Sequence, residues 1–154
     1  MKLLVGVDLS ELTEKVVQKA EEVAKALSAK VWIIHVAEPK PDFVGLEIGP
    51  QYIRDSRSKR FHHEHRQIHE IADRLRKAGL DTTALLVQGA TVESILKEAS
   101  RLDVDMIVLG SHGRGRMYQL VVGSVSKGVL HKSEWPVLIV PTHERRTLPE
   151  PANV

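Results

Sequence analysis

Five short runs of consecutive apolar residues divide the chain. They lie at residues 3–7 ("LLVGV"), 31–36 ("VWIIHV"), 83–88 ("TALLVQ"), 106–110 ("MIVLG") and 137–140 ("VLIV"). Several of the runs are rich in β-branched residues. Apolar side chains at consecutive positions are typical of strands that are buried on both faces. The pattern therefore predicts five strands of a sheet with covered faces.

The segments between these runs carry helical signals. We expect four helices, at residues 10–28, 52–80, 91–102 and 124–133. Ser10 and Thr91 are predicted N-caps, and Gly79 is predicted to end the second helix, because glycine readily follows a helix. Strands and helices thus alternate along the chain. With right-handed crossovers, this order predicts an α/β fold with one open parallel sheet and helices on both faces.

Two segments fit neither pattern. Residues 37–50 carry three prolines and two glycines, which predicts a long surface loop. Residues 142–154 are polar and contain proline, and we expect them to form a disordered tail. The remaining 1–141 are predicted to form one domain, since 154 residues can bury a substantial core.

Composition removes several classes of site and partner. The chain has no cysteine, which excludes disulfides, zinc–thiolate sites and thiol nucleophiles. The net charge of +2 gives no reason to expect binding of nucleic acid or of an anionic membrane. The apolar start is too short for a signal peptide, and no window approaches the roughly 18 apolar residues of a membrane span. We expect a cytoplasmic protein that binds neither nucleic acid nor membranes.

The stretch from Leu109 to Ser126, "LGSHGRGRMYQLVVGSVS", follows the fourth predicted strand. Gly110, Gly113 and Gly123 give the spacing G-x2-G-x9-G, with Ser124 directly after it. Glycines let a backbone approach a ligand closely, and successive N–H groups or a helix start can hold an anion. In an open α/β sheet, ligands bind beyond the carboxyl ends of the strands. The stretch therefore predicts a phosphate-binding loop, with a purely structural connector as the alternative.

Two well-known phosphate motifs do not fit this stretch. A P-loop would need Lys and then Ser or Thr where Arg116 and Met117 stand. A dinucleotide loop would need a third glycine where Tyr118 stands. Arg114 and Arg116 could each meet an outer phosphate.

These residues resemble the nucleotide-binding motif of the universal stress protein family. "LLVGVDLSE", "IIHV", "DMIVLGSHGRG" and "GSVSKGVLHKSEWPVLIVP" are each similar to the corresponding family segments, and the resemblance covers residues 2–141. It implies a five-stranded parallel sheet in the order 3-2-1-4-5, a homodimer, and membership of the class that binds ATP. Dimerisation through Val137–Val140 would cover the edge of the last strand.

The resemblance also assigns site residues by position. Asp8 matches an aspartate near the adenosine, with Gly6 and Val7 beside it. Val36 and Leu109 match apolar contacts to the nucleoside. The implied ribose- and phosphate-binding residues are Gly110, His112, Gly113, Gly123, Ser124, Val125 and Ser126. Gly6 stands where some ATP-binding members carry proline, and Asp8 could instead bond only to N–H groups of its own turn.

Three functions remain open at this point. The first is a sensor or regulator that binds ATP, with Mg²⁺ held mainly through the phosphates. The second is a slow ATPase or an autophosphorylating protein that uses Ser124 or Ser126. The third is a partner-binding protein that needs no nucleotide. The loop offers no carboxylate as a general base, and His112 is its one candidate for proton transfer.

A histidine-rich segment, "FHHEHRQIHE" at 61–70, invites a metal hypothesis. His62, His65 and His69 share one helix face, but Arg66 stands where an H-E-x-x-H motif needs glutamate. We interpret the segment as a solvated helix face, with incidental nickel or zinc binding as the alternative.

Overall fold

The computed structural model describes residues 1–37, 50–112 and 122–142, and for residues 50–55 it describes the backbone alone. The elements of the described chain are β1 (Lys2–Gly6), α1 (Thr13–Leu27), β2 (Lys30–Ala37), α2 (Pro50–Lys77), β3 (Thr82–Gln88), α3 (Thr91–Leu102), β4 (Met106–Gly110), α4 (Ser124–Lys132) and β5 (Val137–Val140).

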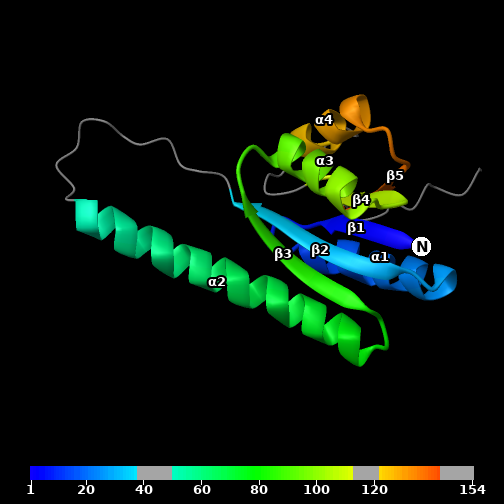
Figure 1. The fold of residues 1–154 in the computed structure, drawn as a ribbon, viewed down its shortest axis with the longest axis horizontal. Coiled ribbons are helices and arrows are strands. Elements are labelled where there is room, and N and C mark those ends of the chain that lie inside the picture. Colours follow the sequence, from blue (N-terminus) through cyan, green and yellow to red (C-terminus); the bar gives the residue numbers. More distant parts are fainter. Residues whose placement is uncertain (38–49, 113–121, 143–154) are drawn as a thin grey trace, which may run out of the picture.

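The five strands form one parallel sheet in the order β3-β2-β1-β4-β5, as predicted. β1 lies at the centre, with β2 and β4 as its neighbours. Helices α1 and α2 cover one face of the sheet, and α3 and α4 cover the other (Figure 1). The predicted α/β architecture is therefore confirmed.

The core consists of two apolar layers on opposite faces of the sheet. Because side chains alternate along a strand, Leu3 and Val5 of β1 join the layer under α1 and α2, whereas Leu4 joins the layer under α3 and α4. β1, β2 and β4 are buried on both faces, as their apolar runs predict. The two outer strands, β3 and β5, are only half-buried because each has one neighbouring strand.

The first helix begins later than the sequence predicts. α1 starts at Thr13 with Leu12 at the N-cap position, although Ser10 was the expected cap. The carboxylate of Asp8 accepts hydrogen bonds from the amide and the hydroxyl of Ser10. Leu9 adopts a left-handed conformation with φ of +58°. The Asp8 side chain thus holds residues 9–12 in a turn before the helix can start.

Other helix ends agree more closely with prediction. Gly79 has φ of +91° and follows the end of α2, which confirms its predicted role. α3 has the predicted bounds, but Ala90 rather than Thr91 occupies its N-cap position.

Lys132 of α4 donates to the carboxylate of Glu93 in α3 and lowers the pKa of that carboxyl. This exposed ion pair links the two helices on one face of the sheet.

Thr142 extends the folded part of the chain by at least one residue beyond the predicted boundary at 141. It is buried, although the sequence predicts that 142–154 form a disordered tail, and its carbonyl accepts from Lys15 Nζ at 3.0 Å. The rest of the predicted tail, 143–154, and most of the predicted loop at 37–50 lie outside the described residues.

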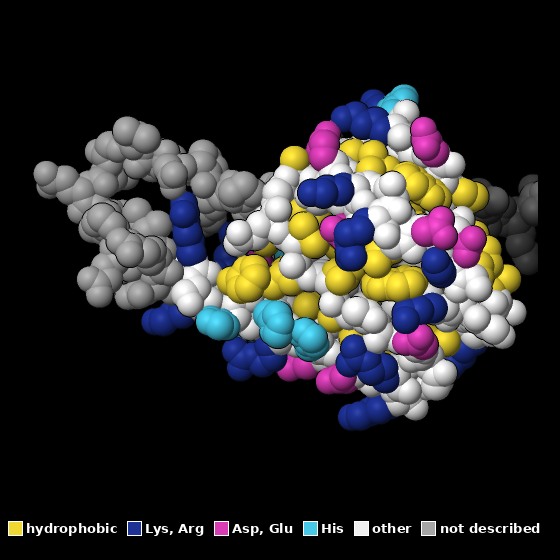
Figure 2. All heavy atoms as spheres, viewed as in Figure 1, with side chains coloured by type: hydrophobic (Ala, Val, Ile, Leu, Met, Phe, Trp, Pro, Cys, Tyr) yellow, Lys and Arg dark blue, Asp and Glu magenta, His cyan; other side chains and the backbone are white. Residues whose placement is uncertain are grey.

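The histidine-rich part of α2 is exposed on one side and buried on the other. His62, His63 and His65 are exposed, while Glu64 and Ile68 face the sheet. Histidine side chains lie in a row along α2 in Figure 2. The rings of His65 and His69 are 4.3 Å apart between centroids. Within the described residues, no group of three or more potential metal ligands converges.

The helices of the described chain include none that is long and apolar enough to cross a membrane.

Replacing Leu4 with alanine tests the layer beneath α3 and α4. Leu4 is fully buried at the centre of the sheet, so we expect Leu4→Ala to lower the free energy of unfolding by about 2–5 kcal/mol. Leu27→Ala is the control, because Leu27 is exposed. Urea unfolding of both variants should show a large loss for Leu4 alone, and equal losses would contradict this description of the core.

Candidate functional site

The carboxyl ends of β1 and β4 lie side by side at the centre of the sheet. The chain leaves β1 toward β2 on one side, whereas β4 lies on the other side and leads to β5. The strand order therefore reverses between β1 and β4, and open α/β sheets bind ligands at such a point. The segments that follow these two strands contain most of the predicted site residues.

Gly6 ends β1 where the two strands approach closely. A Cβ atom on Gly6 would lie 2.5 Å from Cδ2 of Leu109, which would force this side chain to move. The next residue, Val7, donates its N–H to the carbonyl of Ile34 at 2.9 Å. The absence of a side chain at position 6 is therefore explained by packing against β4.

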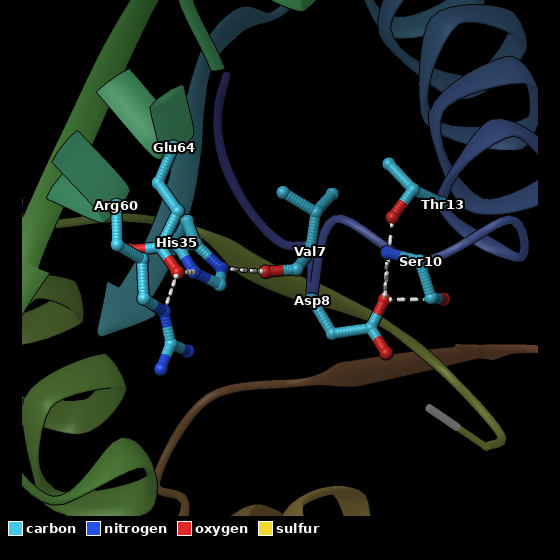
Figure 3. A network of polar contacts seen from close by, with 7 residues as sticks. All are labelled: Val7, Asp8, Ser10, Thr13, His35, Arg60 and Glu64. Atoms are coloured by element: carbon cyan, nitrogen blue, oxygen red, sulfur yellow. Dashed lines mark hydrogen bonds and ion pairs between the residues drawn. The ribbon is translucent and has the colours of Figure 1, made fainter. Parts of the chain in front are cut away.

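Asp8 follows β1 and uses one of its two carboxylate oxygens within its own turn. Oδ1 accepts from the Ser10 amide at 3.1 Å, the Ser10 hydroxyl at 2.7 Å and the Thr13 hydroxyl at 3.2 Å (Figure 3). Oδ2 points away from Ser10 and Thr13 (Figure 3). It is buried and has no hydrogen-bond partner among the described residues. The turn hypothesis thus accounts for one oxygen and leaves the other able to accept a hydrogen bond.

Val36 and Leu109 lie in the same apolar layer, at the ends of the strands on either side of β1. Both are buried, and both belong to the cluster under α3 and α4. Val125 at the start of α4 packs against this cluster. The structure thus brings together the apolar residues that the resemblance assigns to the nucleoside.

A polar network fixes the segment that follows β4. Ser111 donates its N–H to the carbonyl of Val140 at 2.8 Å, and its hydroxyl accepts from the Thr142 amide at 3.1 Å. Thr142 Oγ1 in turn accepts from the His112 amide at 3.3 Å. The ring nitrogen Nδ1 of His112 lies 3.1 Å from the Ser111 hydroxyl. Residues at the end of β5 therefore hold His112 beside the end of β4.

Gly113 comes next in the predicted loop. Together with Arg114 and Arg116, it lies outside the described residues, and the expectations for these three positions stay predictions.

The start of α4 is attached directly to the end of β4. Gly123 donates its N–H to the Ser111 carbonyl at 2.6 Å and occupies the N-cap position of α4. Among the described residues, no side chain caps this helix, so N–H groups of its first turn are left without a capping partner from that part of the chain. Ser124 is exposed and Val125 is half-buried in that turn. Such a helix start favours an anion.

The two serines of α4 differ in role. The Ser126 hydroxyl donates to the Gly110 carbonyl at 2.7 Å and is buried. A hydroxyl carries one proton, so in this arrangement Ser126 ties α4 to β4 and has no proton to donate to a phosphate. The Ser124 hydroxyl is the exposed one of the pair.

Three residues near the site, His35, Glu64 and Thr142, make structural contacts that the sequence did not predict. His35 Nδ1 lies 2.9 Å from the carbonyl oxygen of Val7, and Glu64 of α2 lies behind His35. Thr142 organises the end of β4. Two features of the sequence could have indicated His35 and Glu64. One is a histidine inside an apolar strand, and the other is a glutamate on the same face of α2 as the buried Ile68.

The universal stress protein family model matches residues 1–141 of the chain. The chain belongs to the universal stress protein family. A universal stress protein of Thermus aquaticus, encoded in the 3′ region of a QAH/OAS sulfhydrylase, is 29% identical over 144 residues, which is 90% of this chain and 96% of that protein.

Solved structures of family members share the fold. The structure of MJ0577, a universal stress protein of Methanocaldococcus jannaschii, superposes with a TM-score of 0.78 at 25% identity and covers 94% of this chain and 97% of that one. A universal stress protein solved in complex with cAMP superposes with a TM-score of 0.66 at 27% identity, covering 93% and 98% of the two chains. This similarity agrees with the observed strand order.

The link between α4 and β4 can be tested with Ser126→Ala. The change leaves the Gly110 carbonyl without the Ser126 hydroxyl, so we expect the free energy of unfolding to fall by about 1–2 kcal/mol. Ser124→Ala is the matched control, and we expect it to change stability by less than about 0.5 kcal/mol because Ser124 is exposed. Similar values for both variants in urea unfolding would show that the Ser126 bond contributes little.

Proposed function

We propose that this universal stress protein binds an adenine nucleotide, ATP in particular, at the carboxyl ends of β1 and β4. It then acts as a nucleotide-dependent sensor or regulator in the stress response. The observation that carries the proposal is Oδ2 of Asp8. This oxygen is a buried acceptor without a partner among the described residues, and it follows β1 at the edge of the sheet where α4 also begins. A buried acceptor of this kind is costly unless a donor meets it.

The parts of an adenine nucleotide match the parts of this site. A sugar hydroxyl or the adenine amino group can donate to Asp8 Oδ2. The apolar side chains of Val36 and Leu109 suit the nucleoside. The uncapped N-terminus of α4 at Gly123 and Ser124 suits the phosphates. Under this proposal His112, held beside Gly123 through Ser111, meets the ribose or a phosphate.

The donor set of the site fits Mg²⁺ that is held through the phosphates. Asp8 is the one carboxylate among the described site residues, and its Oδ1 already accepts three hydrogen bonds. Mg²⁺ in nucleotide sites keeps several waters and binds substrate phosphates together with one or two carboxylates. The solved relative that binds cAMP supports an adenine ligand in this family.

Asp8→Asn tests the role of Oδ2 separately from the role of Oδ1 in the turn. The asparagine carbonyl can keep the turn with Ser10, while the amide replaces the Oδ2 acceptor by a donor. We expect the wild type to bind ATP in calorimetry, and Asp8→Asn to bind about ten-fold to hundred-fold more weakly. Asp81→Asn is the control, because Asp81 is exposed at the opposite end of the sheet. No binding to the wild type at millimolar ATP would end the proposal.

We also propose that β5 pairs two copies of the chain. β5 has β4 as its one partner strand within the described sheet, and Val137, Leu138 and Ile139 stay partly exposed. An apolar edge strand that is not covered favours association, and a second copy would cover it symmetrically.

The mass in solution tests the pairing through β5. We expect the wild type to have twice the 17.2 kDa mass of one chain in light scattering after size exclusion. Ile139→Lys places a charge on the exposed edge and should give a folded monomer, while Leu27→Lys on the exposed end of α1 should stay dimeric. A monomeric wild type at micromolar concentration would contradict the pairing.

A further inference from the structure

One buried threonine lies against the segment that follows β4. Thr142 stands two residues beyond the end of β5 and is 2% exposed. Its N–H donates to the Ser111 hydroxyl at 3.1 Å, and its carbonyl accepts from Lys15 Nζ at 3.0 Å. A Cβ atom on Gly110 would lie 3.0 Å from Cγ2 of Thr142, so the threonine methyl lies close to β4. The backbone and the methyl of Thr142 thus fix its hydroxyl beside the end of β4.

The Thr142 hydroxyl and the start of α4 bind the two sides of one peptide group, which joins Ser111 to His112. The N–H of this group, from His112, donates to Thr142 Oγ1 at 3.3 Å. Its carbonyl, from Ser111, accepts from the N–H of Gly123, the N-cap residue of α4, at 2.6 Å. Because a peptide group is planar, a rotation that changes one of these bonds also changes the other. The Thr142 hydroxyl therefore helps to position the start of α4.

The same hydroxyl also has an acceptor for its own proton. Thr142 Oγ1 donates to the His112 carbonyl at 3.4 Å and lies 3.2 Å from the Ser111 hydroxyl. A hydroxyl carries one proton and two lone pairs, so it can accept from the His112 N–H and donate to one of these oxygens at the same time. A methyl group in its place could do neither. Removing the hydroxyl alone thus removes contacts to the backbone of His112 and keeps most of the side-chain volume.

We propose that Thr142 is a positioning residue that sets the preference of the site for phosphorylated nucleotides over nucleosides. The inference rests on the proposed nucleotide function. In that function the phosphates meet the N–H groups at the start of α4, whereas the adenosine meets Asp8 and the apolar layer under α3 and α4. Thr142 acts on the phosphate contacts, through the peptide group between Ser111 and His112. Loss of its hydroxyl therefore weakens ATP binding and leaves adenosine binding nearly unchanged.

Thr142→Val gives the decisive measurement, because valine replaces the hydroxyl by a methyl group of similar size. Calorimetry with Mg²⁺ and ATP, and separately with adenosine, gives the two dissociation constants for each protein. We expect the affinity for ATP to fall about three- to ten-fold and the affinity for adenosine to change by less than about two-fold. Equal losses for the two ligands, or no loss for either, would overturn the inference.

Two matched variants separate the hydroxyl from packing and from stability. Thr142→Ser keeps the hydroxyl and should restore the wild-type ratio of ATP affinity to adenosine affinity. Thr82→Val removes another buried threonine hydroxyl, which donates to the Leu80 carbonyl at 3.3 Å near the first residue of β3. It should unfold at a lower urea concentration than the wild type and keep the wild-type ratio. A serine variant that behaves like Thr142→Val, or a changed ratio in Thr82→Val, would contradict positioning by the Thr142 hydroxyl.

Ser111→Ala reaches the same peptide group from its other neighbour, and it serves if Thr142→Val does not fold. The change removes the acceptor of the Thr142 N–H and the hydroxyl that lies 3.1 Å from His112 Nδ1. We expect the affinity for ATP to fall about two- to five-fold, again with less than about two-fold change for adenosine. An unchanged ratio of the two affinities would count against the inference.

Amide hydrogen exchange tests the positioning without any nucleotide. In Thr142→Val the amides of His112 and Gly123 should exchange about three- to ten-fold faster than in the wild type, and in Thr82→Val they should not. Unchanged exchange in Thr142→Val would show that the hydroxyl does not hold this peptide group. If the wild type binds neither ATP nor adenosine, the proposed function fails and the preference fails with it. If the wild type binds ATP and Thr142→Val keeps its ratio of affinities, the inference alone fails.

Discussion

The burial of β1 on every side constrains the rest of the structure. β2 and β4 pair with its two edges, and the helices cover both of its faces. The side chains of residues 3–5 in β1 are therefore buried in the core, and the strand ends at Gly6. The first polar side chain after the buried residues of β1 is Asp8. The proposed ligand site lies beyond the carboxyl ends of β1 and β4, where this topology reverses the strand order.

The same constraint shows which parts of the molecule could be predicted. β4, β5 and α3 have their predicted bounds, because buried runs and a strongly periodic helix leave little choice of register. The predicted start of α1 is wrong because Asp8 accepts hydrogen bonds from Ser10 and Thr13 and holds the chain in a turn before the helix, contacts that no periodicity records. The buried polar pair of His35 and Glu64 was missed because its members are 29 residues apart in the sequence and meet only after β2 and α2 pack. The glycine spacing predicts Gly110 and Gly123 in one phosphate-binding loop, and this stays a prediction. The structure joins their segments through the bond from Gly123 to Ser111, but the spacing could not separate the roles of the serines that follow.

The proposed site joins residues that are satisfied by contacts within the protein with groups that are not. Gly6, Ser126 and Thr142 are explained by contacts within the protein. Asp8 Oδ2 and the uncapped start of α4 are not satisfied in this way among the described residues. That division separates residues that build the site from those that would meet a nucleotide under the proposed function, although the resemblance assigns Gly6, Asp8 and Ser126 alike to nucleotide binding.

The most direct test of the account is a map of amide chemical shifts by nuclear magnetic resonance as Mg²⁺ and ATP are added. We expect the largest changes at Val7 and Asp8, at Gly110 to His112, and at Gly123 to Ser126, while the amides around Gly79 and Asp81 at the opposite end of the sheet keep their positions. Shifts that cluster at that opposite end, or no shifts at millimolar nucleotide, would contradict a nucleotide site between β1 and β4.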